Sequence, residues 1–185
     1  FMPNLIGGIV LGYIWQLIIN GILLKVVGQD IYYNPSYGFW GLIILMNWQQ
    51  IGYMMIIYVA GIQNVPPELI EAAKIDGATK WQTLWNVTIP NVMPSITICV
   101  FLTLTNSFKL YDQNLALTGG LPAVTDEQGI THRLTQMLAL CISDTYGNSA
   151  RAHGTAQAMA VVFFLLVAVI SLTQLMLTRR KEVQQ

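Results

Sequence analysis

The stretch ELIEAAKIDGATKWQTLWNVTIPNVMP, from Glu68 to Pro94, is a charged segment between two long apolar ones. The chain has nine Lys or Arg and nine Asp or Glu residues among 185, yet five charged residues fall between Glu68 and Lys80. This concentration of charge does not fit inside an apolar layer, because a buried unpaired charge is costly. The stretch therefore predicts a small polar unit held outside two flanking apolar helices.

Composition places the chain in the membrane class. Hydrophobic residues make up 54% and charged residues 10%, whereas soluble domains carry about 25% charged residues. The formal net charge is zero, which argues against a nucleic-acid partner. Cys99, Cys141, His132 and His153 lie far from one another at no ligand spacing, so we expect no metal site and read the cysteines as small apolar residues.

Four segments are long and apolar enough to cross a bilayer, which takes about 20 residues in a helix. They cover approximately residues 5–27, 39–62, 92–110 and 156–177. The alternative, a closed barrel, needs short alternating strands that this sequence lacks. We therefore predict an all-α, polytopic membrane helix bundle with four spans, forming one domain over residues 1–185.

Orientation follows from the positive charge that flanks the spans. Four spans put both chain ends and the Glu68–Pro94 stretch on one side of the membrane. Arg179, Arg180 and Lys181 directly follow the fourth span, and basic residues in that position favour the cytoplasm. The chain also opens on Phe1-Met2-Pro3 without a secretory signal, and we expect an N-terminally truncated protein.

The polar stretch itself predicts two short helices joined by an elbow. Pro67 suits the first turn of a helix, and Gly77 falls where a left-handed residue ends one. Thr79 and Gln82 have the spacing of a capping box for the second helix. Pro90, with Pro94 beyond it, predicts the end of that helix and the entry to the third span.

Two roles for this elbow remain open from the residues alone. Ala72 and Ala73 form a thin surface that would let the groove of another protein approach closely. Alternatively, the elbow is an interfacial helix that anchors the loop. Trp81 and Trp85 would then lie at the lipid headgroups or pack under the bundle.

The connection at the other side of the membrane, from Tyr111 to Arg151, is long for a passive loop. Thr118 to Pro122 has the composition of a turn. From His132 to Ile142, apolar residues recur at helical spacing, which predicts a helix packed against the outer ends of the spans. We favour packing over direct ligand contact for this helix.

The order of residues in the polar stretch resembles the EAA signature of permease subunits in binding-protein-dependent ABC importers. Glu71-Ala72-Ala73 is followed at the family spacing by Gly77 and then by Val87-Thr88-Ile89-Pro90. Residues 107–112, 117–122, 146–147, 154–158 and 174–181 are similar to sugar permeases of the maltose and multiple-sugar type. Leu121 departs from them, since a glycine is usual there. Members of that family usually have further spans upstream, so the resemblance implies that such spans are lacking here.

The resemblance implies a transporter subunit of the bacterial cell membrane rather than an enzyme. Its implied partners are cytoplasmic ABC ATPase subunits, a second permease subunit and an extracytoplasmic solute-binding protein, with a sugar as substrate. The sequence has no GxxxxGK[ST] phosphate loop, so a partner would hydrolyse ATP. Residues 68–90 would be the coupling segment, with these residues carrying it: Glu71, Ala72, Ala73, Lys74, Asp76, Gly77 and Pro90.

Polar residues inside spans are costly and often functional. As a solute pathway we single out Asn47, Trp48, Gln49 and Asn106, because amides and an aromatic face suit a sugar. Hydrogen bonding between helices is the alternative for each of them, as it is for Gln50, Gln16 and Asn20. Lys109 and Asp112 are three apart and predict a local ion pair.

Small residues at helical spacing predict surfaces where helices pack closely. They are Gly8 and Gly12 near the start of the chain, and Ala152, Ala156 and Ala160 near its end.

Other functions remain as alternatives. The solute of such a permease could instead be a polyol, glycerol-phosphate or an amino acid. A channel or scaffold that works without ATP would leave the EAA spacing unexplained. A membrane-embedded enzyme is disfavoured, since no paired carboxylates, Ser/His set or metal cluster lies at the edge of a span.

Overall fold

The computed structural model describes residues 2–148 and 150–179 of the chain. Arg180 and Lys181, which the orientation argument used, lie outside the described residues. The described part is mostly helical, as the composition predicted. Its elements are η1 (Met2–Leu5), α1 (Gly8–Val26), α2 (Pro35–Gln63), α3 (Pro67–Ile75), α4 (Lys80–Thr83), η2 (Leu84–Thr88), α5 (Ile89–Phe108), α6 (Asp112–Leu117), β1 (Ala123–Thr125), β2 (Thr131–Arg133), α7 (Leu138–Asn148), η3 (Ala150–Ala152) and α8 (His153–Arg179).

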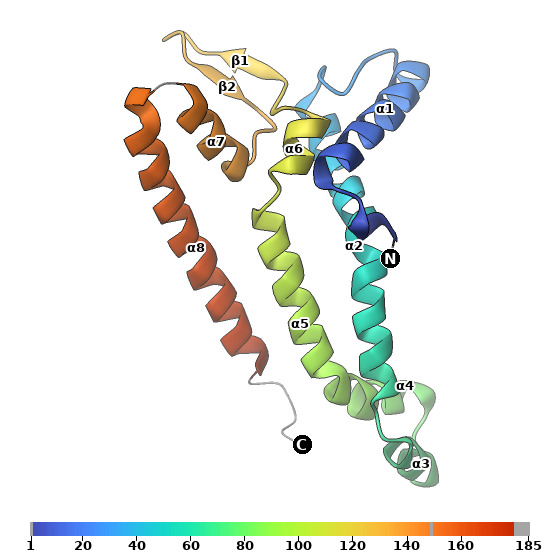
Figure 1. Ribbon diagram of the computed structural model, residues 1–185. Helices are drawn as coiled ribbons and strands as arrows, with labels where there is room; N and C mark the ends of the chain where they lie inside the picture. The colour runs from blue at the N-terminus through green and yellow to red at the C-terminus, as the bar shows by residue number, and fades with distance from the viewer. Residues whose placement is uncertain (1, 149, 180–185) are drawn as a thin grey trace.

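Four helices are long and apolar enough to cross a membrane: Gly8–Val26, Pro35–Gln63, Lys80–Phe108 and His153–Arg179. Three of them stand side by side, with α5 between α2 and α8 and in contact with both (Figure 1). The polar elbow of α3 and α4 lies at one end of these spans, where α2 ends and the third span begins. The two-stranded antiparallel sheet of β1 and β2, together with α6 and α7, lies at the other.

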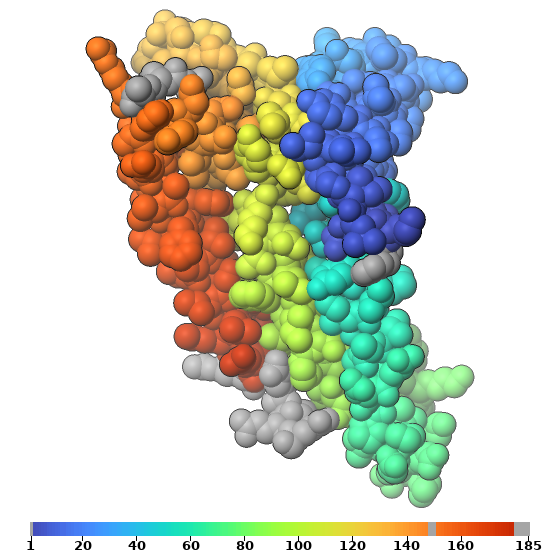
Figure 2. Space-filling view, in the orientation of Figure 1, coloured from blue at the N-terminus to red at the C-terminus, as the bar shows by residue number. Residues whose placement is uncertain are grey.

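The spans bury few of their side chains within the chain itself. Figure 2 shows α2, α5 and α8 as adjoining columns. In the most apolar window of α8, 6% of the residues are buried, and Phe164 and Val162 are 68% and 64% exposed. Exposed apolar surface of this extent fits contact with lipid or with other membrane helices. The fold is therefore that of a helical membrane protein.

The best-packed region lies at the sheet end of the spans. Leu11, Ile31, Leu42, Leu45 and Leu117 form a buried cluster drawn from α1, α2, α6 and the loop before α2. Every one of these side chains is at most 2% exposed. Because the cluster joins elements that are distant in sequence, it fixes how α1 and α6 sit on α2.

The third span begins earlier than predicted. The prediction that the second helix of the elbow ends at Pro90 is wrong, because Lys80–Phe108 runs as one continuous helix. Residues Leu84–Thr88 form a π-turn, in which the Ile89 N–H donates to the Leu84 carbonyl. Pro90 directly follows this π-turn as the second residue of α5, so its missing N–H falls where the helix changes its hydrogen-bond pattern. Pro94 is inside the helix, as membrane helices tolerate.

The predicted helix over residues 132–142 is also wrong in its bounds. His132 lies in β2, which pairs with β1 so that Val124 faces His132, and the helix α7 begins at Leu138. Leu134 is 49% exposed and does not belong to a packed helical face. Helical spacing over eleven residues did not reveal the competing hairpin, whose strands pair through backbone groups. The expected packing against the outer end of a span is confirmed, since α7 contacts α8.

The glycine pair of α1 is a packing surface, as its spacing predicted. A Cβ atom at Gly8 would lie 2.7 Å from the Asp112 Cβ, and one at Gly12 would lie 2.6 Å from the Ala116 Cβ. This close contact joins α1 to α6 at the sheet end. Consequently α1 is tilted, and the N-terminal end lies beside α2 instead of at the elbow (Figure 1). The expectation that both chain ends lie with the elbow is therefore wrong for the N-terminal end.

Replacing Gly12 with alanine should destabilise the protein. The new methyl group would overlap the Ala116 Cβ, and overpacking of this kind costs about 1–3 kcal/mol. Gly21→Ala is the matched control, because nothing lies within 4 Å of a Cβ at Gly21 and alanine favours the helix. Thermal unfolding in detergent should show a lower midpoint for Gly12→Ala than for Gly21→Ala. Equal midpoints would contradict the close packing of α1 on α6.

Candidate functional site

The elbow begins with α3, a nine-residue helix that buries none of its residues. Pro67 occupies its first turn and Glu68 places a negative charge there, where the helix dipole favours it. Lys74 lies in the last turn, where a positive charge is favoured for the same reason. A helix this short is marginal alone in water, so its ends need to be capped.

Gly77 ends α3 in the way its position predicted. Its φ is +78°, a left-handed conformation that glycine adopts without strain. The Ala78 N–H donates to the Ala73 carbonyl at 2.9 Å, and the Gly77 N–H donates to the Lys74 carbonyl at 3.1 Å. These two bonds form a Schellman motif, which turns the chain sharply at this residue.

The capping box at Thr79 is confirmed. It begins α4, which forms the second arm of the elbow, as α3 forms the first. The Gln82 N–H donates to Thr79 Oγ1 at 3.4 Å, and the Thr79 N–H donates to Gln82 Oε1 at 2.8 Å. One residue, Ala78, separates this cap from Gly77. Both arms of the elbow are therefore held by hydrogen bonds right up to the bend, and the bend has a defined geometry.

The predicted coupling residues fall into two groups. Glu71, Ala72, Lys74, Asp76 and Gly77 are exposed together on α3 and its end, and Ala73 is partly buried. Pro90 is separate from them, because it lies in the first turn of α5. The structure thus brings six of the seven residues onto one small unit and leaves Pro90 in the membrane-length helix.

The carboxylates and the lysine of α3 do not pair with each other. Among residues 2–148 and 150–179, the ion pairs within 4.0 Å are His132–Asp126 at 3.0 Å and Arg133–Asp144 at 2.6 Å. Glu71 and Lys74 therefore remain available to an outside partner. The large apolar side chains of the elbow are also open, with Ile75 86% and Trp81 70% exposed.

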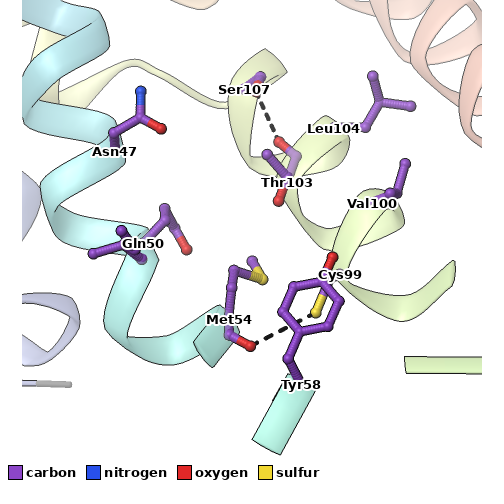
Figure 3. A pocket seen from close by; sticks show the side chains of 10 residues that line it. Asn47, Gln50, Met54, Tyr58, Cys99, Val100, Thr103, Leu104 and Ser107 are labelled. Atoms are coloured by element: carbon purple, nitrogen blue, oxygen red, sulfur yellow. Dashed lines mark hydrogen bonds between the residues drawn. The ribbon is translucent and has the colours of Figure 1, made fainter. Parts of the chain in front are cut away.

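A groove of about 470 Å³ lies between α2 and α5, midway along the row of spans. In Figure 3, Asn47 and Gln50 from α2 stand across the space from Thr103 and Ser107 of α5. The remaining lining residues are apolar or weakly polar side chains further along both helices: Ile51, Met54, Tyr58, Cys99, Val100 and Leu104.

The polar groups of the groove are held by their own backbone. Asn47 Nδ2 donates to the Ile43 carbonyl at 2.8 Å, and Ser107 Oγ donates to the Thr103 carbonyl at 2.7 Å. These bonds use the Ser107 hydroxyl hydrogen and one of the two Asn47 amide hydrogens, and they leave oxygen lone pairs free to accept. A mostly apolar groove with a few oriented polar groups is the usual form of a small-molecule site.

The predicted pathway residues do not all reach this groove. Asn47 lines it, whereas Gln49 is 6% exposed and accepts from Gln113 Nε2 at 3.0 Å. Trp48 packs edge-on against Trp15, with ring centroids 5.6 Å apart. Asn106 is not a lining residue. Neighbouring helical residues point about 100° apart, so the run Asn47-Trp48-Gln49 spreads over three faces.

Residues that the sequence reasoning missed line the groove instead. Tyr58, Thr103 and Ser107 were not singled out, and Gln50 was weighed without being chosen. A helical signal for them exists in the sequence. Positions 47, 50, 51, 54 and 58 share one face of α2, and positions 99, 100, 103, 104 and 107 share one face of α5.

The other polar residues of the spans bond between helices and loops. Gln16 Nε2 donates to the Tyr32 hydroxyl and to the Leu117 carbonyl, the latter at 3.1 Å. The Ile31 N–H donates to Asn20 Oδ1 at 2.8 Å. Interhelical bonding, the alternative reading of these residues, is therefore confirmed for Gln16, whereas Asn20 bonds to the loop before α2.

The predicted ion pair of Lys109 and Asp112 is wrong, because no contact within 4.0 Å joins these two described residues. Lys109 is the cap that ends α5, and Asp112 is the first residue of α6. The spacing rule for charge pairs applies within one helix, and a helix boundary separates these two.

The connection at the sheet end is built around a buried amide. Asn114 is fully buried, and its Nδ2 donates to Thr118 Oγ1 at 3.0 Å and to the Thr135 carbonyl at 2.9 Å. Its Oδ1 accepts from the Met137 N–H at 2.9 Å. Asn114 thus ties α6 to the chain between β2 and α7.

Charged groups hold the hairpin in the same region. The Asp126–His132 hydrogen bond, helped by the backbone N–H groups of Ile130 and Gln128, holds the pKa of the Asp126 carboxyl below its ordinary value. Arg133 Nη1 and Gln136 Nε2 both donate to Asp144 Oδ2 at 2.6 Å. Within the described ranges, no three His, Cys, Asp or Glu side chains gather as they would around a metal ion.

Comparison with known proteins gives the following matches. The family model described as "Binding-protein-dependent transport system inner membrane component" matches residues 1–183. A probable starch degradation products transport system permease protein of Thermoanaerobacterium thermosulfurigenes is 44% identical over all of this chain and 62% of its own length. A multiple sugar-binding transport system permease protein of Streptococcus mutans is 33% identical over 76% of this chain and 45% of its own length.

A third match, a putative ABC transporter permease protein of Caldicellulosiruptor, is 32% identical over 80% of this chain and 99% of its own length. The chain thus spans 62% and 45% of the two longer relatives described above. All three relatives are named as permease proteins and not as enzymes.

Removing the hydroxyl at the elbow should loosen its second arm. Thr79→Ala deletes the acceptor of the Gln82 N–H, and loss of such a cap costs about 0.5–2 kcal/mol. Hydrogen exchange should then speed up by several-fold to about tenfold at the amides of Gln82 and Thr83, which bond to Thr79. Thr79→Ser keeps the hydroxyl and should exchange as the parent does. Unchanged exchange in Thr79→Ala would show that the box does not hold the bend.

Proposed function

The chain belongs to the family of binding-protein-dependent transport system inner membrane components, and from this premise we propose that it is a permease subunit of an ATP-driven sugar importer. In this role residues 1–185 belong to one transmembrane domain in a bacterial cell membrane, and residues 68–90 are its coupling segment. Its partners are a cytoplasmic ATPase, a second permease subunit and an extracytoplasmic solute-binding protein.

The observation that carries the proposal is the capped elbow at one end of the spans. The EAA residues Glu71, Ala72 and Gly77 are exposed there on a helix that buries nothing within the chain. An alanine surface permits close approach of another protein, and unpaired charges next to it offer specificity. Such a unit suits docking into a groove of the ATPase.

The connection between elbow and groove supports coupling. α2 leads into α3, and α4 leads through η2 into α5, so the helices that line the groove are the two that carry the elbow. Because helices are stiff, a displacement of the elbow moves both groove walls. ATP-driven motion at the elbow would in this way change the width of the solute path.

The substrate class rests on the relatives and on the chemistry of the groove. Two relatives carry names that refer to starch degradation products and to multiple sugars. Asn47, Gln50, Thr103 and Ser107 supply amide and hydroxyl groups without a fixed charge, which suits a neutral polyhydroxylated solute. For the predicted pathway residues Trp48, Gln49 and Asn106 we propose a supporting role around this groove.

The coupling role is tested by Gly77→Val in the assembled complex. A β-branched residue at φ +78° strains the bend, so sugar-stimulated ATP hydrolysis should fall by about tenfold, roughly 1.4 kcal/mol of coupling. Gly28→Val is the matched control, since Gly28 also ends a helix with φ +72° and has open space around it. Its ATP hydrolysis should stay within about twofold of the parent, a change below 1 kcal/mol. An equal loss of sugar-stimulated ATP hydrolysis in both variants would show that the elbow has no specific role in coupling.

The solute path is tested by thiol labelling in a background free of other cysteines. Thr103→Cys and Ser107→Cys place thiols in the groove, and Thr97→Cys places one on the same helix at a position 3% exposed. A water-soluble thiosulfonate should label the first two about tenfold faster than the third, because only solvated thiolates react. Labelling should slow when maltotriose and the binding protein are added. If the groove thiols react only with a lipid-soluble reagent, the groove does not carry a solute.

A further inference from the structure

The helix that forms the third span is longer than the apolar layer it crosses. Lys80–Phe108 is 29 residues, or about 43 Å at the helical rise, whereas the hydrocarbon layer is about 30 Å thick. Lys109 caps the far end of this helix, and its charge marks the boundary there. Tilt of the helix takes up part of this excess of about 13 Å, and the rest falls at the elbow end, on α4 and η2.

Two tryptophans occupy this excess. Trp81 and Trp85 are four residues apart, so they lie on one side of the helix, and they are 70% and 61% exposed. They do not pack under the bundle. Tryptophan concentrates at membrane–water boundaries, where its ring meets the acyl chains and its N–H meets the headgroups.

A second set of exposed aromatics lies at the opposite end of the spans. Tyr33 just before α2, and Phe39 and Trp40 near its start, are 67%, 48% and 59% exposed. From Trp40 to Gln63, where α2 ends, the helix rises about 35 Å. α2 is therefore long enough to reach from this set across the apolar layer to the elbow end, where Trp81 and Trp85 lie.

The charges of the two elbow arms differ in a way that suits a lipid surface. Lys80 precedes Trp81 and is exposed, so it can pair with lipid phosphate. The α3 arm carries Glu68 and Glu71 and ends at Asp76, against the single Lys74. An anionic leaflet therefore attracts the second arm and repels the first.

We propose that Trp81, Trp85 and Lys80 bind the phospholipid headgroup boundary and fix the second arm of the elbow to the membrane, leaving α3 free. This inference rests on the proposed function only for which side of the membrane the elbow occupies. The bend at Gly77 then joins a lipid-anchored arm to a protein-docking arm. In this arrangement α3 would move relative to the bilayer, while the second arm stays in place at the membrane surface.

The test uses the full-length protein in nanodiscs that contain anionic phosphatidylglycerol, with no ATPase present. In separate variants, Trp81 or Trp85 is the sole tryptophan and phenylalanine replaces the others. Lipids brominated near the top of the acyl chain should quench the emission about twofold more than lipids brominated near the chain middle. Trp40 as sole tryptophan should behave alike, because it lies in the exposed aromatic set at the opposite end of the spans.

Three results would overturn the inference. Quenching of Trp81 and Trp85 by aqueous iodide but by neither lipid would place them in water. Stronger quenching by the mid-chain lipid would place them inside the apolar layer. Loss of lipid quenching when the ATPase is added would show that these tryptophans belong to the protein interface. The main measurement needs no ATPase, so the two proposals can fail separately. If the lipids quench as expected but coupling is intact in Gly77→Val, the coupling role of the elbow is contradicted and the membrane anchor is not.

Discussion

The structure depends on the requirement that every backbone N–H and C=O within an apolar layer be hydrogen-bonded inside its own helix. This requirement makes the spans helical. Where the chain departs from regular helix, its backbone groups must still find hydrogen-bond partners close by. The π-turn at Leu84–Thr88 lets the helix reach Pro90 without a break, because the Ile89 N–H still finds the Leu84 carbonyl. The elbow lies where the same requirement is relaxed, and its backbone groups are satisfied by the Schellman bonds of Gly77 and the capping box of Thr79.

The two ends of the spans are built by different physics. At the sheet end, apolar burial and a buried amide hold irregular segments together, with Leu117 and Asn114 both fully buried on α6. At the elbow end, local hydrogen bonds set the shape and leave the surface open. A packed end resists change of shape, whereas a capped bend on a bare helix moves as a unit. This difference fits an elbow that transmits motion and a sheet end that holds the spans together while it does so.

Between these ends, the groove and the interhelical contacts divide the polar residues of the spans. Gln16, Asn20 and Gln49 have their polar groups used within the protein, so they serve packing. Asn47 and Ser107 bond to their own helices and still face open space. A polar side chain in a span is therefore informative about function only once its partners are known.

The class of the molecule and the shape of the elbow could be predicted from the sequence alone. Four apolar runs, Pro67, Gly77 and the Thr79–Gln82 pair each act through rules that span a few residues, so no distant contact was needed to predict them. The close-packing role of Gly8 and Gly12 was predicted on the same grounds. Tertiary structure decided what those glycines touch, because Asp112 and Ala116 are about a hundred residues away. It also decided the hairpin that displaced the start of α7, the passage of the third helix through Pro90, and the faces to which Asn47, Trp48 and Gln49 turn. In each case the outcome depends on which neighbour packs against a helix, and that is a property of the folded chain as a whole.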